Sequence, residues 1–266
     1  MTVIPVPAFK DNYLWLLSRN GDAVVVDPGD AAPVEAALLE HGLALRAILL
    51  THHHADHVGG VRALIDARRG EDLAVHGPAG EAIDGVTHTV KGGERVALDA
   101  LGTSFDVIDV PGHTRGHIAY YGGPSEGSND EGGPLLFCGD TLFAAGCGRL
   151  FEGTPQQMHE SLSKLAALPS NTRVYCAHEY TLANLRFARA VEPDSAELIA
   201  REQAAIATRR RGAPTLPSTI ALERATNPFL RSDEPTVRAA AEKKKPGAGS
   251  SALETFTAIR RWKDSF

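Results

Sequence analysis

The sequence predicts an α/β protein in which a strand-rich first part is followed by a helical second part. Up to about residue 180, short runs of β-branched and aromatic residues alternate with turn-forming residues, and a few helical patterns lie between them. From about residue 181 onward, apolar residues recur about 3.6 positions apart among Ala, Glu and Arg. An early strand–helix–strand pattern predicts a βαβ unit, which is typical of parallel sheets.

The predicted strands are eight runs of strand length, each bounded by Gly, Pro, Asp or Asn. In chain order they are YLWLLS, DAVVVDPG, ALRAILLT, DLAVHG, FDVIDVPG, HIAYYGG, PLLFCGD and RVYCAHE. Between the second and third runs, DAAPVEAALLEHG predicts a helix that Asp30 can cap and that Gly42 can close. The Gly-rich segment GGPSEGSNDEGGP joins the sixth and seventh runs and predicts a mobile surface loop.

The rest of the chain carries four helical patterns separated by Pro and Gly. They are TLANLRFARAVE, DSAELIAREQAAIATRRR, EPTVRAAAEKKK and SALETFTAIRRWKDSF. We therefore predict a strand-rich domain over residues 1–180 and a helical domain over residues 181–266.

Composition and charge exclude several classes of protein. A hydrophobic content of 43% with 23% charged residues is ordinary for a soluble globular protein. The net charge of −6 argues against a nucleic-acid-binding protein, which needs clustered Lys and Arg. No segment reaches the roughly 18 apolar residues of a membrane span. Three cysteines without framework spacing argue against disulfides and favour a reducing compartment. We expect a cytoplasmic monomer that binds neither nucleic acid nor membranes.

The segment THHHADHVGG follows an apolar strand and concentrates residues that bind metals. Residues two apart at the end of a strand project to the same side, so His52 and His54 can share one ion. The chain then turns, and Asp56 and His57 face a second position. Imidazole and carboxylate ligands suit zinc, iron or manganese. Two glycines end the segment and are expected to let the following helix pack closely.

Three more strand ends carry the same residue types. His113 follows FDVIDV, Asp140 follows PLLFCG, and His178 follows RVYCA. A single histidine after a strand is commonly a structural residue, but four strand ends of this kind in one chain are poorly explained by chance. The sequence therefore predicts a metal site built from several strand ends.

These motifs carry a resemblance to a known family. THHHADHVGG, PGHTRGH, FCGDTLF and AHEY, in this order, resemble the motifs of the metallo-β-lactamase superfamily. Together with CGRLFEGTP and the C-terminal helices, they resemble the glyoxalase II (hydroxyacylglutathione hydrolase) family, from PAFKDNYLW to RRWKD. The resemblance implies a metallo-β-lactamase αββα sandwich with a C-terminal helical domain and a dinuclear metal centre.

Ligand roles follow from the resemblance, position by position. It implies that the first metal is held by His52, His54 and His113, the second by Asp56, His57 and His178, with Asp140 as the bridge. The metals are expected to be zinc, with iron or manganese as alternatives. His53 is left outside this set, and a supporting role is expected for it and for His117.

The implied reaction is hydrolysis of S-(2-hydroxyacyl)glutathione, such as S-D-lactoylglutathione, to glutathione and a 2-hydroxy acid, the second step of methylglyoxal detoxification. Coordination lowers the pKa of a water from about 16 toward about 7, so that hydroxide is available as the nucleophile at neutral pH. Asp56 and Asp140 are the expected catalytic carboxylates, since Asp140 bridges the metals and Asp56 could assist proton transfer. A thiol with a pKa near 8.5 can leave without a dedicated acid.

Residues for binding the glutathione part are implied in the same way. They are Arg149, Phe151, Tyr180, Asn184, Arg260 and Lys263. Arg260 and Lys263 are three positions apart on a predicted helix, so both can face one carboxylate. Some family members have Lys at the position of Arg149, and others have Tyr at the position of Phe151, so both departures bear on substrate affinity.

Two alternative functions share part of this pattern. A glutathione persulfide dioxygenase of the same superfamily would use one iron and oxygen, whereas the second-metal set of Asp56, His57 and His178 favours a hydrolase. A β-lactamase or lactonase would share the metal site, but the helices ending in RRWKD argue against it.

Overall fold

The computed structural model describes residues 1–123 and 133–266. The chain forms two compact units: Met1–Asp109 with Arg115–Gly139, and Val110–Thr114 with Asp140–Phe266. These units divide the chain at other points than the boundary predicted near residue 180, which stays a prediction. Most of the loop predicted between Tyr121 and Leu135 falls on residues 124–132, outside the described residues.

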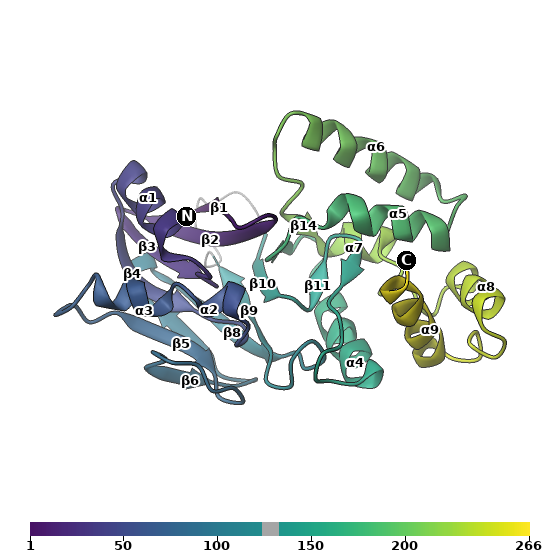
Figure 1. Cartoon of the computed structure of the whole chain (residues 1–266), viewed down its shortest axis with the longest axis horizontal. Coiled ribbons are helices and arrows are strands. Elements are labelled where there is room, and N and C mark those ends of the chain that lie inside the picture. The colour runs from purple at the N-terminus through teal and green to yellow at the C-terminus, as the bar shows by residue number, and fades with distance from the viewer. Residues whose placement is uncertain (124–132) are drawn as a thin grey trace. The chain divides into compact units, whose positions relative to one another are not determined.

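The first unit begins with a mixed six-stranded sheet (Figure 1). Its first three strands are antiparallel and the next three join in parallel. In sheet order they are β1 (Thr2–Ala8), β2 (Asn12–Arg19), β3 (Asp22–Val26), β4 (Ala44–Leu49), β5 (Ala74–Pro78) and β6 (His88–Val90). Strand β1, absent from the predicted strands, contains Pro5 and Pro7 and lies at the sheet edge, where a missing N–H is tolerated.

Helix α1 (Ala31–His41) makes the predicted crossover between β3 and β4, which confirms the βαβ unit. The Asp30 side chain accepts a hydrogen bond from the Ala32 N–H, and Gly42 ends the helix at a φ of 61°. After β4 the chain enters the short α2 (Ala55–Val58) and then α3 (Val61–Asp66). Side chains of α1 and α3 pack in one apolar cluster with those of β2 to β5.

A second group of strands in this unit is antiparallel. In neighbouring order they are β10 (Leu135–Gly139), β9 (Ile118–Gly123), β8 (Thr103–Asp109) and β7 (Arg95–Leu98), with a 3₁₀ turn at Asp99–Leu101. The Tyr120 hydroxyl of β9 donates a 3.0 Å hydrogen bond to the Leu50 carbonyl just after β4. Burial and the neighbouring Asp27 carboxylate raise the pKa of Tyr120, so this buried hydroxyl keeps its proton as a donor.

The second unit is mainly helical. Its strands are the hairpin β11 (Leu142–Phe143) and β12 (Gly146–Cys147) and the antiparallel pair β13 (Arg173–Cys176) and β14 (Ser218–Thr219). Its helices are α4 (Pro155–Ala166), α5 (Thr181–Val191), α6 (Ala196–Arg210), α7 (Ile220–Thr226), α8 (Pro235–Lys244) and α9 (Ala252–Asp264). The four predicted helices correspond to α5, α6, α8 and α9, while α4 and the short α7 were not among them.

The interior of the second unit contains an aromatic cluster. Phe187 of α5 stacks with Phe229 at 5.9 Å between ring centroids, and Phe229 meets Phe256 of α9 edge to face. All three rings are fully buried. Each such ring contributes roughly 1.5–3 kcal/mol through burial, so the cluster fixes α9 against α5. Among the described residues, no helix is both long and apolar enough to cross a membrane.

A buried ion pair joins Arg201 of α6 to Glu223 of α7. The Glu223 carboxylate also accepts hydrogen bonds from the Ser218 hydroxyl and, at 2.8 Å, from the Ala145 N–H. Its partner Asn227 donates to it at 3.0 Å. Since a buried charge is tolerated only when its hydrogen-bonding capacity is used, this network fixes α6, α7 and the β11–β12 turn together.

We predict that Glu223→Ala lowers the free energy of unfolding by about 3–5 kcal/mol, because Arg201 would stay buried without its counter-charge. Urea denaturation followed by circular dichroism measures the change. Glu202→Ala is the matched control, since Glu202 lies 3.7 Å from Arg189 in a partly exposed pair worth less than about 1 kcal/mol. Equal losses in the two variants would contradict a stabilising role for the buried network.

Candidate metal and substrate site

The histidine segment of the first unit follows β4 and leads into α2. His52 and His57 are fully buried, while His54 and Asp56 are partly exposed. The His52 Nε2 and His54 Nδ1 atoms lie 3.1 Å apart, and the His57 Nε2 atom lies 3.6 Å from an Asp56 carboxylate oxygen. The two predicted pairs of ligands are therefore each brought together within this unit.

Asp27, which belongs to none of the predicted metal-binding motifs, orients this segment. One of its carboxylate oxygens accepts the Thr51 N–H at 2.8 Å, and the other lies 2.7 Å from the Thr51 hydroxyl and 3.1 Å from His57 Nδ1. With Nδ1 of His57 facing Asp27, Nε2 is the ring nitrogen left to face a metal. Asp27 is buried and follows β3, so the strand-end context that revealed the other candidates also applies to it.

Two neighbouring histidines have other contacts. His53 turns its Nδ1 toward the Glu81 carboxylate at 2.9 Å. His117 stacks on His52 at 4.5 Å between ring centroids, and its Nδ1 lies 3.0 Å from the Ile118 carbonyl oxygen. Stacking restrains the plane of the His52 ring, which fits the supporting role expected for His117.

Close backbone approach explains a glycine on each side of this segment. A Cβ on Gly29 would lie 1.8 Å from the Asp56 carbonyl oxygen, and one on Gly60 would lie 2.5 Å from the Ala31 nitrogen. Neither distance is sterically possible. The close packing predicted for Gly59 and Gly60 is confirmed, since a Cβ on Gly59 would also lie 2.6 Å from the Gly29 carbonyl oxygen. Gly29 shows the same constraint but was not predicted.

The second unit presents three further candidates, His113, Asp140 and His178, all of them buried. Asp140 lies between the two histidines. One of its carboxylate oxygens is 3.4 Å from His113 Nε2, and the other is 3.3 Å from His178 Nε2. A carboxylate whose two oxygens face different ligand groups has the arrangement that a bridging ligand needs.

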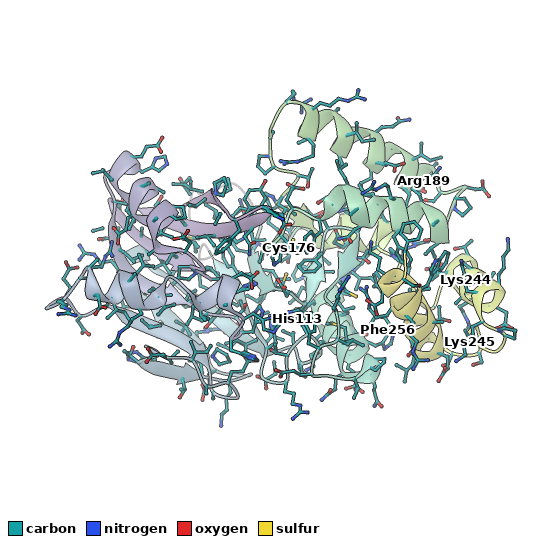
Figure 2. The ribbon with its side chains drawn as sticks, viewed as in Figure 1. His113, Cys176, Arg189, Lys244, Lys245 and Phe256 are labelled. Carbon is teal, nitrogen blue, oxygen red and sulfur yellow. The ribbon has the colours of Figure 1, made fainter. Side chains whose placement is uncertain are left out.

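The loop after Asp140 holds His113 in place (Figure 2 labels His113). The Arg149 carbonyl oxygen lies 2.9 Å from His113 Nδ1, so the Nε2 atom remains on the Asp140 side. The N–H groups of Phe151 and Glu152 both donate to the His113 carbonyl at 3.3 Å. Gly148 is required here, because a Cβ on it would lie 1.9 Å from the Asp140 carbonyl oxygen.

Aromatic side chains surround these ligands. The Tyr180 ring stacks on His178 at 4.7 Å between ring centroids, with an interplanar angle of 1°. Phe143 meets both of these rings edge to face. Phe151, in turn, meets His113 edge to face at 5.2 Å and is 64% exposed. Tyr180 and Phe151 therefore combine contact with a candidate ligand and access from solvent.

The structure gives three other predicted substrate residues contacts within the unit. The buried Asn184 donates its side-chain amide to the Ala144 carbonyl at 3.1 Å. The buried Arg260 donates to the Cys147 carbonyl and to Asp264, both at 2.9 Å. Lys263 donates to a carbonyl of α5 at 3.4 Å. Their contacts with substrate stay predictions.

Positive charge accumulates around Lys263. Its pKa is lowered by burial and then by the neighbouring cations Arg260, Arg186 and Arg149. Cations that lower one another's affinity for protons favour a bound anion at the same place. The exposed Arg149 belongs to this group, and Arg186 extends the set of cations predicted from sequence.

Both parts of the sequence match models of known protein families. Residues 10–178 match the model of the metallo-β-lactamase superfamily. Residues 179–266 match the model described as the hydroxyacylglutathione hydrolase C-terminus. The chain belongs to the hydroxyacylglutathione hydrolase family. That membership confirms the resemblance on which the predicted ligand set was based.

Similar proteins in the family cover the whole chain. A hydroxyacylglutathione hydrolase of Cupriavidus taiwanensis is 56% identical over 270 residues, which are 100% of this chain and 99% of the relative. One of Pseudomonas aeruginosa is 55% identical over 98% of both chains. The structural likeness to ETHE1 from Myxococcus xanthus has a TM-score of 0.64 at 22% identity, covering 98% of this chain and 90% of that one.

A second solved structure, TTHA1623 in a di-iron-bound form, has a TM-score of 0.57 at 28% identity. It covers 86% of this chain and 100% of that chain. Together these similarities confirm the predicted metallo-β-lactamase fold with its C-terminal helical region. The fold and the His and Asp groups described above provide a candidate site for divalent metals.

We predict that Asp27→Ala weakens metal binding about 10- to 100-fold, because His57 loses the partner that orients its ring. Competition with a chromophoric chelator measures the affinity. The control is Asp22→Ala at the other end of β3, where Asp22 pairs with the exposed Arg46. A metal affinity of Asp27→Ala equal to that of Asp22→Ala would show that Asp27 does not orient a ligand.

Proposed function

We propose that this protein is a metal-dependent thioester hydrolase that cleaves S-(2-hydroxyacyl)glutathione to glutathione and a 2-hydroxy acid. The observation that carries the proposal is the 56% identity over the full chain to a hydroxyacylglutathione hydrolase, including the C-terminal region with its own family match. The preferred substrate would be S-D-lactoylglutathione, as in the second step of methylglyoxal detoxification. The cations around Lys263 support an anionic substrate.

Seven side chains would hold two divalent metal ions, most simply zinc. We assign His52, His54 and His113 to the first ion, Asp56, His57 and His178 to the second, and Asp140 to both. The geometry within each unit fits this assignment, because Asp27 and the Arg149 carbonyl orient His57 and His113 through Nδ1. The donor set of imidazoles and carboxylates also suits iron and manganese, so metal analysis of the purified protein decides between them.

When bound, the metals would supply an activated water and an electrophile for the thioester carbonyl oxygen. The chain's own residues set the geometry for that chemistry. Asp140 keeps both carboxylate oxygens toward histidine Nε2 atoms, and Asp56 accepts a 3.0 Å hydrogen bond from the Asn12 amide. An Asp56 carboxylate held in this way can serve as a ligand and receive a proton. Asp56 and Asp140 are therefore our proposed catalytic carboxylates.

Binding of glutathione would use the residues around the second unit's ligands. Tyr180 and Phe151 offer exposed rings beside His178 and His113. Arg149 and Lys263 would attract the glutathione carboxylates. Arg260 and Asn184 are buried and bonded to the β11–β12 hairpin, so their contribution would include holding that hairpin in shape.

The cellular setting and assembly also remain proposals. We expect a cytoplasmic monomer, and three buried cysteines without the spacing of a disulfide framework, Cys138, Cys147 and Cys176, support a reducing compartment. Burial raises the pKa of Cys176 to about 12, so this thiol would stay protonated and resist oxidation. Light scattering of the purified protein would test the monomer.

A panel of three substrates tests the reaction. The metal-loaded protein should release thiol from S-D-lactoylglutathione with a kcat/KM at least about a hundredfold above its kcat/KM for a simple lactone or a β-lactam. Oxygen consumption with glutathione persulfide is measured alongside. Turnover of the lactone or β-lactam alone, or of the persulfide alone, would overturn the proposed function in favour of a lactonase-type hydrolase or a dioxygenase.

We predict that Lys263→Ala raises KM about tenfold while kcat changes little, because Lys263 would contact the glutathione part and not the thioester. Steady-state kinetics measure both constants. Lys263→Arg should retain part of the affinity, and the exposed neighbour Arg261 provides the control variant Arg261→Ala. An unchanged KM in Lys263→Ala would refute this assignment.

We predict that Asp140→Ala loses bound metal and activity together, because this carboxylate is the only side chain assigned to both ions. Metal content by mass spectrometry and thiol release are measured on the same preparation. Asp109→Ala, at the end of β8, serves as the control for folding and handling. Full metal content in Asp140→Ala would refute its role as a bridge.

A further inference from the structure

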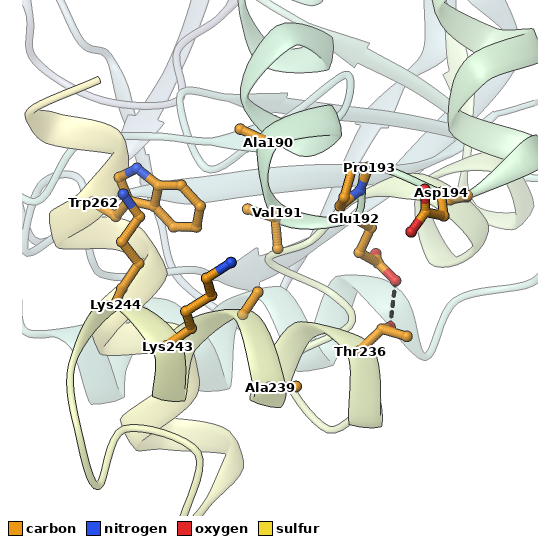
Figure 3. A pocket seen from close by; sticks show the side chains of 12 residues that line it. Ala190, Val191, Glu192, Pro193, Asp194, Thr236, Ala239, Lys243, Lys244 and Trp262 are labelled. Atoms are coloured by element: carbon orange, nitrogen blue, oxygen red, sulfur yellow. Dashed lines mark hydrogen bonds between the residues drawn. The ribbon is translucent and has the colours of Figure 1, made fainter.

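We propose that the second unit contains a binding site for an organic anion with an apolar body, separate from the thioester site. The site is a cavity of about 820 Å³ bordered by the end of α5, the start of α6, and helices α8 and α9 (Figure 3). Small-molecule sites in proteins commonly have volumes of about 300–1,000 Å³. The cavity is therefore large enough for a ligand the size of an aromatic carboxylate.

The walls of this cavity are mostly apolar. Val191 of α5, Ala239 and Ala240 of α8, and the indole of Trp262 on α9 line it. In Figure 3 the Trp262 ring lies beside the Lys244 side chain, at the opposite end of the lining from Asp194. Such walls exclude water from the apolar body of a ligand. An apolar ligand body fits this lining.

Two ammonium groups from the last turn of α8 supply the charge. The Lys244 Nζ atom lies over the Trp262 ring, 4.2 Å from its centroid. Lys243 extends into the cavity in Figure 3, and within residues 1–123 and 133–266 it forms no ion pair. An anionic group bound between Lys243 and Lys244 would leave the ligand body against Trp262.

The acidic residues of the lining do not cancel this charge. Glu192 accepts hydrogen bonds from Arg231 at 3.0 Å with both carboxylate oxygens, and from the Thr236 hydroxyl at 2.6 Å. The pKa of Arg231 is raised mainly by its hydrogen bond to Glu192, so the charge of Glu192 is already matched. Only Asp194, exposed at the cavity edge, opposes the two lysines.

The site is also separate from the cations proposed to bind glutathione. Consecutive residues of a helix point about 100° apart, so Trp262 and Lys263 leave α9 in different directions. Lys263 donates to the Ala183 carbonyl and is not among the residues that line the cavity, whereas Trp262 is. A ligand in the cavity would therefore contact α9 without occupying the place of the thioester substrate.

Direct binding of a matched pair of probes tests the proposal. Isothermal titration of the metal-loaded protein with 1-naphthylacetate should show one site, and the neutral 1-naphthylacetamide should bind at least about tenfold more weakly. Lys243→Gln and Lys244→Gln should each weaken binding of the carboxylate about tenfold. Lys245→Gln is the matched control, because Lys245 is the next residue, is exposed and does not line the cavity.

A variant that fills the cavity locates the binding. Ala240→Phe should abolish binding of 1-naphthylacetate while the thermal unfolding midpoint and the hydrolysis of S-D-lactoylglutathione stay close to those of the wild type. Absence of binding to the wild type, equal affinity for acid and amide, an equal loss in Lys245→Gln, or binding retained in Ala240→Phe would each overturn the proposal. Because the readout is binding, the result is independent of the proposed thioesterase activity.

Discussion

The hydrogen bonds accepted by the Asp27 carboxylate fix the segment on which the first unit's metal chemistry depends. This single side chain joins the end of β3 to Thr51 and to His57, across the βαβ unit. A carboxylate buried at the end of a sheet is costly unless it accepts hydrogen bonds. Asp27 faces three such donor groups, and these contacts restrict the loop to one arrangement. The histidines that follow Thr51 are thereby placed by the sheet and not by the loop itself.

In the second unit, backbone and side-chain groups together support the candidate ligands. The Arg149 carbonyl orients His113, and the buried Glu223 holds the turn of the β11–β12 hairpin through the Ala145 N–H. Asn227 adds hydrogen bonds to the carbonyls of that hairpin. The charged Glu223 thus supports the hairpin near the candidate metal ligands without being a ligand itself. Its hydrogen bonds are made within the protein.

Sequence was sufficient for those features that repeat a local rule. Residues close together in the sequence predict the capped helix after Asp30. They also predict the strands that end before His52, His113 and His178. Strand β1 was missed because its two prolines weaken the strand pattern, although an edge position tolerates them. Arg186 and Glu223 were missed because their partners, such as Lys263 and Arg201, lie far away in the sequence. Asp27 follows a strand as the predicted ligands do, but its role depends on the distant Thr51 and His57. No local spacing encodes such pairs.

The stacking of Tyr180 on His178 has an evolutionary consequence. The two family matches meet between residues 178 and 179, so this aromatic pair spans their junction. One ring belongs to the part shared with a superfamily of many activities, and the other to the part characteristic of this family. Exchange of the C-terminal region for another would therefore replace an aromatic neighbour of a metal-ligand candidate, and a single inserted residue at the junction would unstack the pair. A recombined chain would keep the stacked pair only if the spacing between His178 and Tyr180 were kept.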